Sequence, residues 1–528
     1  MKCIYPLLFA AALVLWVAAT NPGQYRLSDV GIVLAAVVAV CALAVLAVFL
    51  ILRALDHTGR AAPLAAALVM LAVAWCFYYF PAQHAVSFVG GWASRDPVLV
   101  PVGILFTLAA LAWLVRQPRG RLLVVNGFMS RFGLFLVIII GAQAALSLVR
   151  QPSIVRRSGL IRELATPLRT LGPLPSRNVP LRDIYLVVLD GHANARVLGE
   201  VFGFDNSRFE DSLRSLGFYV PRDVRSNYVQ TYLSVSSLLN FSHVTRLTQD
   251  AGETSKDHSL PTYLVKHNRA ARFLKTQGYK YVLFPSAWWA ATANSPLADQ
   301  EFDPRQGFDL RHELQRTELR LAVLRSTLLR LAFLSDETST PLVQHFIRSF
   351  RGLGEVAADP APTFAFAHIL LPHVPYLLDE RCRPLEHPIP DDMEADTPEQ
   401  RRDYVAQVKC VDHLVLELVT ALLRRSPTPP VILLVGDHGP RFADVGFYEH
   451  PERVSSAFIR ERFGAFGAFY LPEDGARAFE EPVTLVNVVG NVLRYYFNAD
   501  VPPSANQLYV SGEELYRFYP VERPLGTR

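Results

Sequence analysis

The stretch Val431–Pro440 reads V-I-L-L-V-G-D-H-G-P and decides the fold. Five apolar residues run directly into an Asp-His pair that is flanked by glycines. A short apolar run that ends in turn residues is typical of a strand buried on both faces, as in a parallel sheet. Such sheets place ligand-binding groups just past the carboxyl ends of their strands. Asp437 and His438 would lie there as a carboxylate and an imidazole, a mixed pair that suits Zn²⁺ or Mn²⁺.

A second stretch repeats this pattern. Asp183–His192 reads D-I-Y-L-V-V-L-D-G-H, a strand that delivers Asp190 at its end with a glycine next. Asp-Gly is also common turn chemistry, so the alternative for either site is a capped turn that binds nothing. Because both motifs occur in one domain, we favour a shared metal site.

The first 150 residues are dominated by apolar sequence. Each of five runs approaches the ~20 residues that a helix needs to cross a bilayer. One such run could be a buried core helix, but five in succession with almost no acidic residues predict a transmembrane domain over residues 1–150. The runs are Ile4–Thr20, Val30–Leu52, Ala61–Phe80, Val98–Val115 and Phe132–Val149.

Basic residues set the orientation of these helices. With the N-terminus in the cytoplasm, the outside loops hold only Arg26 and Arg95, as the positive-inside rule requires. Arg150 and two arginines soon after it run against the rule, which a large translocated domain can override. Everything after Arg150 is then exported. The first run could instead be a cleavable signal peptide, which leaves the export unchanged. The inside segments hold Lys2, Arg53, Arg60, Arg116, Arg119, Arg121 and Arg131.

Charge and cysteine content narrow the classes of function. The formal net charge of +4 is small for 528 residues, and no basic, aromatic-rich groove pattern is present, so we expect no nucleic-acid partner. Cys382 and Cys410 are the only cysteines in the exported part. They could pair in an oxidising compartment, and the alternative is two buried free thiols.

The exported part begins with a proline- and arginine-rich linker over residues 151–182. Its leucine-rich piece Leu160–Leu171 could lie on the membrane surface. Residues 183–528 then alternate strand-like and helix-like stretches, which predicts an α/β domain with a mostly parallel sheet. Glu313–Leu334 reads as a basic amphipathic helix that could rest on anionic lipid or pack on the sheet. The expected strands are Ile184–Leu189, Tyr279–Phe284, Thr363–Ile369, Val431–Val435 and Ala465–Tyr470.

Thr231 is a candidate nucleophile. The sequence from Thr231 onward, T-Y-L-S-V-S-S-L-L-N, reads as a helix with an apolar side. Free backbone N–H groups and the positive end of the helix dipole favour a phosphate at its first turn. A threonine hydroxyl is a poor nucleophile near neutral pH, but coordination to a divalent cation lowers its pKa. The alternative is that Thr231 serves only as a helix cap.

Three histidines are candidates for contact with substrate. The stretch Thr363–Tyr376 feeds His368 from a strand and places His373 in the proline-bounded loop L-P-H-V-P-Y. Prolines on both sides hold the loop backbone, which suits a residue that meets a phosphoryl oxygen or shuttles a proton. His450 follows the Asp-His pair by twelve residues in a polar loop. A satisfied core position for His368 and simple exposure for His450 are the alternatives.

With these motifs in place, the exported domain resembles the alkaline phosphatase superfamily. It is most similar to the membrane-bound sulfatase-like branch, which includes phosphoethanolamine transferases and lipoteichoic acid synthase, and the resemblance covers the whole architecture. It implies that Asp190 is the first acidic metal ligand and that Thr231, in T-Y-L-S-V-S, is the metal-bound nucleophile. Asp437 and His438 then match the Asp-His ligand pair of the branch.

The same resemblance assigns the substrate side of the site. His373, in H-V-P-Y, and His450, by its spacing, match histidines that contact substrate. One divalent cation, Zn or Mn, is expected, and a second metal near these histidines is left open. The implied partners are membrane lipids, a lipid phospho-donor and an envelope glycan or lipid acceptor. The implied location is the bacterial cytoplasmic (inner) membrane, multi-pass, with the catalytic domain in the periplasm.

Departures from the branch bear on the donor and acceptor. The first ligand is Asp190 where lipid-modifying members have Glu, and the stretch after Thr231 lacks the proline and cysteine of phosphoethanolamine transferases. The formylglycine motif of true sulfatases is absent. The resulting hypothesis is metal-dependent transfer of a phosphoethanolamine- or phosphoglycerol-like group through a covalent threonine intermediate. The alternatives are a phosphoric or sulfuric ester hydrolase and a non-catalytic membrane assembly or glycan-binding protein.

Overall fold

The computed structural model describes residues 3–20, 25, 27–55, 59–87, 96–172, 181–286, 289, 291–302, 318–328, 339–357, 359, 361–389, 396–443 and 445–522. Two compact units make up the chain. The first contains Met1–Pro152 and Leu310–Ser335, and the second contains Ser153–Asp309 and Asp336–Arg528. A short segment far along the sequence therefore belongs to the N-terminal, apolar unit.

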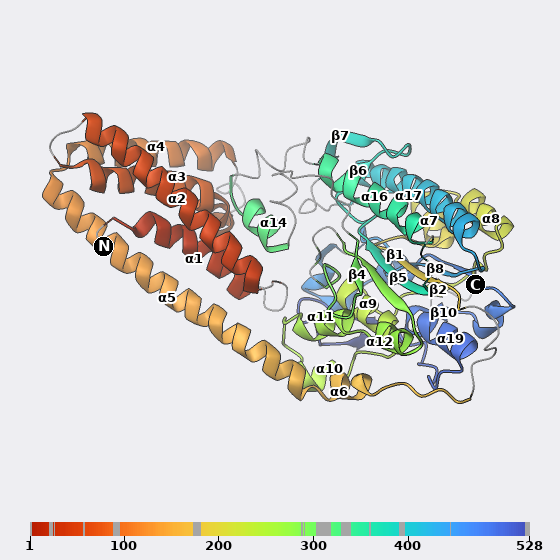
Figure 1. Ribbon diagram of the computed structural model, residues 1–528. Coiled ribbons are helices and arrows are strands. Elements are labelled where there is room, and N and C mark those ends of the chain that lie inside the picture. The colour runs from red at the N-terminus through yellow and green to blue at the C-terminus, as the bar shows by residue number, and fades with distance from the viewer. Residues whose placement is uncertain are drawn as a thin grey trace. The chain divides into compact units, whose positions relative to one another are not determined.

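The first unit is built from apolar helices (Figure 1). Among the described residues, four of them carry stretches long and apolar enough to cross a membrane. The remaining predicted span, α1, has 16 residues, which is about 24 Å of helix and shorter than the ~30 Å hydrocarbon core. The prediction of five spans thus holds for four helices, and α1 is a shorter, largely buried apolar helix. The helices are α1 (Tyr5–Thr20), α2 (Leu27–Leu55), α3 (Ala61–Ser87), α4 (Asp96–Arg116) and α5 (Arg119–Arg157).

The segment predicted as a helix over Glu313–Leu334 is described in part, as α14 (Glu318–Arg325). Leu319 and Val323 are buried in a cluster with side chains of α1 and α2. This helix therefore packs on the apolar helices of the first unit and not on the sheet. Residues 326–328 form a turn, and the other residues of the predicted helix lie outside the described residues.

The border that we expected at residue 150 falls inside a helix, because α5 continues to Arg157. Helix α6 (Gly159–Ala165) follows at once, and the Ser158 side chain caps it by accepting the Ile161 N–H at 3.1 Å. Leu160 and Leu164 are buried in a core cluster of the second unit. The apolar side chains of this helix therefore face protein, where the sequence suggested a membrane surface.

The second unit contains a six-stranded sheet, which confirms the predicted α/β class. Its order is β4-β3-β5-β1-β8-β9, and every neighbouring pair is parallel except β8 with β9. Strands β1, β5 and β8 are buried throughout, as expected of parallel strands covered on both faces. The strands are β1 (Ile184–Leu189), β3 (Lys280–Phe284), β4 (Gln300–Glu301), β5 (Thr363–Ile369), β8 (Val431–Gly436) and β9 (Gly467–Tyr470).

Helices cover both faces of this sheet (Figure 1). Helices α16 and α17 pack against each other on one side, and α9 packs with α11 and α19 on the other. The described helices of the unit also include α7 (Ala195–Phe202), α8 (Ser207–Ser215), α9 (Thr231–Asn240), α10 (Leu247–Ala251), α11 (Ser259–Lys266), α12 (Arg269–Thr276), α16 (Ser339–Val356), α17 (Pro398–Arg425), α18 (Ser456–Phe463) and α19 (Leu485–Phe497).

Short elements complete the unit. They are β2 (Val224–Arg225), β6 (Tyr376–Leu378), β7 (Pro384–Ile389), β10 (Val483–Thr484), β11 (Tyr509–Val510) and β12 (Tyr519–Pro520), with 3₁₀ turns η3 (Val445–Tyr448), η4 (Pro451–Arg453) and η5 (Gly475–Ala478). They pair as β10 with β2, β11 with β12 and β6 with β7.

Candidate metal centre and nucleophile

Two aspartates are brought together by the pairing of the central strands. In the parallel register of β1 and β8, Leu189 lies opposite Gly436. Asp190 and Asp437 are the next residues of the two strands, so both emerge at the same carboxyl edge of the sheet. Both side chains are buried. This is the edge at which parallel α/β sheets bind their ligands.

Each aspartate keeps one oxygen free of hydrogen bonds. Asp437 Oδ1 accepts the backbone N–H groups of Gly191 at 3.1 Å and His438 at 3.0 Å. Asp437 Oδ2 and Asp190 Oδ1 are buried and make no hydrogen bond. A buried carboxylate oxygen without a donor is costly unless a cation approaches it. The two free oxygens therefore mark a place for a positive charge.

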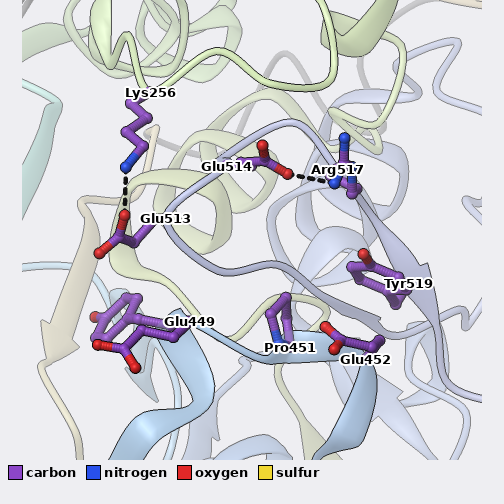
Figure 2. Close-up of a pocket in the computed structure, with 9 residues that line it drawn as sticks. Lys256, Glu449, Pro451, Glu452, Glu513, Glu514, Arg517 and Tyr519 are labelled. Carbon is purple, nitrogen blue, oxygen red and sulfur yellow. Dashed lines mark hydrogen bonds and ion pairs between the residues drawn. The ribbon is translucent and has the colours of Figure 1, made fainter.

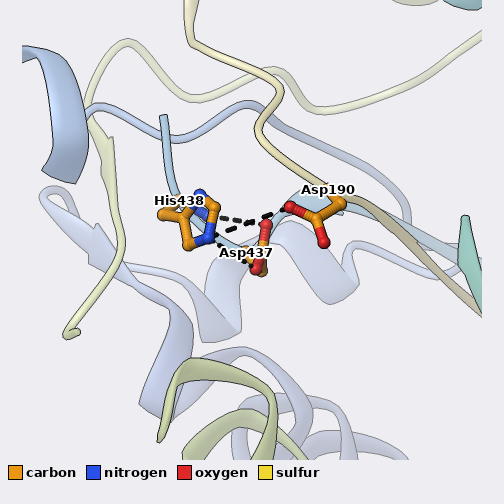
Figure 3. A group of neighbouring side chains, drawn as sticks. All are labelled: Asp190, Asp437 and His438. Carbon is orange, nitrogen blue, oxygen red and sulfur yellow. Dashed lines mark hydrogen bonds and ion pairs between the residues drawn. The ribbon is translucent and has the colours of Figure 1, made fainter. Parts of the chain in front are cut away.

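His438 completes the cluster with Asp190 and Asp437 (Figure 3). Its Nδ1 lies 3.0 Å from the Gly439 carbonyl oxygen, which fixes the proton on Nδ1 and leaves the lone pair on Nε2. That Nε2 lies 3.1 Å from Asp437 Oδ2 and 3.8 Å from Asp190 Oδ1. The three atoms are all acceptors, and one ligand atom from each residue lies within 4.8 Å of the other two. Two carboxylates and one neutral imidazole fit a divalent metal ion such as Zn²⁺ or Mn²⁺.

The ionisation of these groups follows from burial and from their neighbours. Burial and the charge of Asp190 raise the pKa of Asp437 above its ordinary value. Burial alone would raise the pKa of Asp190, but the neighbouring His373 and the hydrogen bond from His368 lower it. Burial and the neighbouring Arg462 hold the pKa of His438 well below its ordinary range. His438 is therefore a neutral imidazole, the form that binds a metal.

Thr231 is the first residue of α9 and points at this cluster. Its Oγ1 lies 3.0 Å from His438 Nε2. Gln230 occupies the cap position, and its side-chain amide is held by the backbone oxygens of Ser511 and Gly512, so Thr231 is not the helix cap. Ser234 Oγ donates to the Asp437 carbonyl at 2.7 Å and joins α9 to the end of β8. The helix N-terminus and the free hydroxyl thus face the acceptor cluster together.

His373 lies at the edge of the cluster, with its ring centroid 6.4 Å from that of His438. Its loop is held by Gln407 of α17, a fully buried residue. Gln407 Nε2 donates to the carbonyl oxygens of Pro372 and His373, both at 3.1 Å. His373 is therefore placed by packing within reach of a substrate bound at the cluster.

The structure does not bring His450 to the cluster. Its side chain is 62% exposed, and its Nδ1 lies 3.7 Å from Glu452. Its chain neighbours Glu449 and Pro451 line a surface hollow of about 360 Å³ near the C-terminal segment (Figure 2). Within the described residues, no hydrogen bond or ion pair joins His450 to the two aspartates or His438. The spacing of His450 from the Asp-His pair in sequence therefore does not place its side chain at the cluster.

Arg462 was not selected from the sequence, and His368 takes the core position that was given as its alternative. Arg462, in α18, is buried and donates from Nη2 to His438 Nε2 at 2.9 Å, from Nη1 to the Gly439 carbonyl at 2.7 Å and from Nε to the Val229 carbonyl at 2.8 Å. His368 Nε2 lies 3.2 Å from Asp190 Oδ2, and its Nδ1 lies 3.2 Å from Thr292 Oγ1. His368 is thus a core histidine that orients an aspartate.

The two cysteines that follow the apolar helices in sequence, Cys382 and Cys410, are joined. Cys382 and Cys410 form a disulfide with a Cα–Cα distance of 5.0 Å. Cys410 lies in α17, and Cys382 lies in the turn between β6 and β7. The bond attaches this hairpin to the helix that also carries Gln407. It therefore supports the loop of His373 from a second direction.

One family model matches part of the chain. Residues 219–458 match the family model described as Sulfatase. These residues include Thr231, His373, Asp437 and His438, and Asp190 precedes them on the neighbouring strand. Over these residues the chain is therefore similar to the Sulfatase family.

Several solved structures are similar in fold. The C-terminal periplasmic domain of EcEptC from Escherichia coli, in complex with Zn, is 15% identical, with 66% of this chain and 94% of that chain covered and a TM-score of 0.43. The integral membrane protein lipooligosaccharide phosphoethanolamine transferase A (EptA) from Neisseria meningitidis is 14% identical, with 95% and 96% covered and a TM-score of 0.39. The lipoteichoic acid synthase LtaP from Listeria monocytogenes is 11% identical, with 70% and 82% covered and a TM-score of 0.34. No curated protein matches the chain.

Proposed function

We propose that this protein is a metal-dependent phospho-group transferase that works outside the cytoplasmic membrane. One observation carries the proposal: Thr231 Oγ1 lies 3.0 Å from His438 Nε2, beside two buried carboxylate oxygens that make no hydrogen bond. A hydroxyl at the N-terminus of a helix, facing a divalent-metal ligand set, is suited to attack on phosphorus.

Asp190, Asp437, His438 and the Thr231 oxygen would hold the cation. When bound, it would lower the pKa of the Thr231 hydroxyl and neutralise charge on the phosphoryl group. The Thr231 oxygen forms a bond to phosphorus while the bond from phosphorus to the donor alcohol breaks, and that alcohol leaves with a proton. An acceptor hydroxyl then loses a proton, attacks the phosphorus and releases Thr231. His373 is placed to hold phosphoryl oxygens or to carry these protons.

A membrane lipid is the proposed donor. Among the described residues, four helices are apolar enough to span a membrane, and α5 leads directly into the second unit. A catalytic unit attached in this way works where phospholipid donors are concentrated. The acceptor would be an envelope glycan or lipid. Solved structures of similar fold include a lipooligosaccharide phosphoethanolamine transferase and a lipoteichoic acid synthase.

A labelled donor tests the proposal. Full-length protein in membranes is supplied with Zn²⁺ or Mn²⁺ and with phosphatidylethanolamine labelled in the headgroup. Label that appears on an envelope glycan or lipid, with diacylglycerol released, supports transfer. Label released as free phosphoethanolamine supports the alternative, a hydrolase with water as acceptor. The product must be analysed because both reactions share the covalent step.

A second measurement separates catalysis from the non-catalytic alternative. Metal analysis of the purified protein, followed by titration with Zn²⁺ and Mn²⁺, should find one tightly bound equivalent. Failure to bind either ion, together with no turnover of labelled lipid, would favour a binding or assembly protein. Mass spectrometry of protein quenched during turnover should find a phosphate-linked adduct on the peptide that contains Thr231.

A further inference from the structure

The segment 318–328 lies between two elements of the catalytic unit in sequence, yet it belongs to the membrane unit. It follows β4 and precedes α16, both of which are part of the second unit. Leu319 is fully buried and Val323 is 7% exposed, in a cluster with Val14, Val17 and Val33 of α1 and α2. An exported loop thus contributes an apolar helix face to the membrane helices.

The contacts lie at one end of the membrane helices. Val14 and Val17 are in the last two turns of α1, and Val33 is in the second turn of α2. Cys76 lies in the C-terminal half of α3. In the topology predicted from the basic residues, all three ends are extracytoplasmic. A loop of the exported part can reach only that side of the membrane, so the two observations agree.

Polar groups at the C-terminal end of the segment bond within the segment or to a membrane helix. The Leu328 N–H donates to the Cys76 carbonyl at 2.8 Å. Thr327 is fully buried, and its Oγ1 donates to the Leu324 carbonyl at 2.9 Å. Ser326 Oγ donates to the Val323 carbonyl at 2.9 Å. Non-helical backbone is tolerated at membrane depth only where protein satisfies it, and this segment meets that condition.

We propose that residues 318–328 dock into the outer-leaflet end of α1, α2 and α3 and hold the catalytic unit to the membrane helices at a second point, besides α5. The chain joins the docked segment to β4 through residues 303–317 and to α16 through residues 329–338. These connections reach at most about 50 Å and 35 Å. Two attachments raise the effective concentration of the site near membrane lipid. The lipid dependence of this idea rests on the proposed function, whereas the docking does not.

Cross-linking tests the docking without any assay of activity. Cys3, Cys41 and Cys76 are replaced by Ser, a protease site is placed within residues 311–317, and Leu319→Cys is paired with Val17→Cys or Val33→Cys. A short bis-maleimide should keep the cleaved chain as one band on a denaturing gel. Leu319→Cys with Leu50→Cys is the matched control, because Leu50 is exposed and lies about 25 Å along α2 from Val33. Cross-linking that is absent from both test pairs, or equal in the control, would overturn the docking.

Activity then tests what the docking does. The double change Leu319→Asp and Val323→Asp should lower turnover of phosphatidylethanolamine in vesicles at least tenfold. Turnover of water-soluble bis(p-nitrophenyl) phosphate should change less than twofold, because the metal centre is untouched. The conservative pair Leu319→Met and Val323→Ile should retain both activities. An equal loss on both probes would reject the tether as a lipid-specific device. If the wild-type protein turns over neither probe, the proposed function is rejected. The docking is then still judged by the cross-linking result.

Discussion

Arg462 Nη2 lies 2.9 Å from His438 Nε2, the nitrogen whose lone pair a metal ion would take. The guanidinium is also held by the carbonyl oxygens of Gly439 and Val229. When Nε2 binds a metal, Nη2 loses that acceptor while the other two bonds keep Arg462 beside the cluster. A guanidinium donor next to the proposed nucleophile, Thr231, is then placed to bind a phosphoryl oxygen.

We therefore expect Arg462→Lys to lower kcat about 10²–10³-fold, the usual cost of removing one preorganised donor. Metal affinity, measured by titration calorimetry, should stay the same or rise, since the site then holds a more compact cation with fewer bonds to His438. Arg460→Lys on the same helix is the control, because Arg460 is 53% exposed and pairs with Glu200. If Arg462→Lys loses metal binding, and this loss alone explains the lost turnover, Arg462 has a purely structural role.

Thr231→Ala should abolish turnover and leave the fold intact, because the side chain is partly exposed and, among the described residues, its hydroxyl hydrogen-bonds to His438 alone. Thr231→Ser keeps an oxygen at the same place and should retain measurable activity. Phosphate-adduct mass spectrometry and turnover of labelled lipid check both variants, and circular dichroism checks the fold. Full activity in Thr231→Ala would exclude this residue as nucleophile. Ser234 is a poor substitute because its hydroxyl donates to the Asp437 carbonyl.

The parts of the site that could be predicted are those with local signals. Asp190 and Asp437 each follow a run of buried apolar residues, and a strand that is buried on both faces is recognisable from its own sequence. The register of β1 with β8 then makes the two side chains neighbours without further information. Thr231 was recognisable because a helical pattern begins at that residue.

The other parts depend on tertiary packing and have no local signal. Arg462 is one of 52 lysines and arginines, and nothing in the sequence of α18 distinguishes it from the exposed Arg460. The apolar face of α14 was visible as a pattern, but periodicity does not name the partner against which a face packs. His450 was chosen by spacing alone, and the chain between Asp437 and His450 takes it to the surface.

Gln407→Ala should destabilise the protein and lower activity through His373. The Gln407 amide oxygen accepts the N–H groups of Leu377 and Leu378, and its nitrogen donates to two carbonyls of the His373 loop. Each buried backbone group left unpaired costs about 1–3 kcal/mol, so a total loss of roughly 2–4 kcal/mol is expected after partial rehydration.

Thermal unfolding compares the stability of Gln407→Ala with that of the control Gln249→Ala, whose side chain is exposed.

The variant Gln407→Glu is more informative, because its carboxylate can still accept from Leu377 and Leu378 but cannot donate to the loop of His373. We expect it to lower kcat while protecting part of the stability. Equal kcat in Gln407→Glu and wild type would show that the hold on the His373 loop does not matter to turnover.

Asp437→Asn should stabilise the metal-free protein while removing its metal affinity. The pKa of Asp437 is raised by burial and by Asp190, so between its ordinary value near 4 and its raised value the folded protein binds more protons than the unfolded chain. The contribution of Asp437 to stability is therefore present at low pH and is lost as the pH rises through that window. Asparagine has no such charge, and near neutral pH the variant should be more stable by on the order of 1–2 kcal/mol.

Urea unfolding of chelator-treated full-length protein in detergent, read by pulse proteolysis of the second unit at several pH values, measures this difference. The gap between Asp437→Asn and wild type should widen from pH 4 towards neutrality, whereas exposed Asp500→Asn should show no trend. Excess Zn²⁺ should reverse the order, since only the wild type gains stability from a bound ion. A difference in unfolding free energy that stays constant with pH would mean that Asp437 carries its charge equally in the folded and unfolded states. The inferred repulsion between the two aspartates would then be wrong.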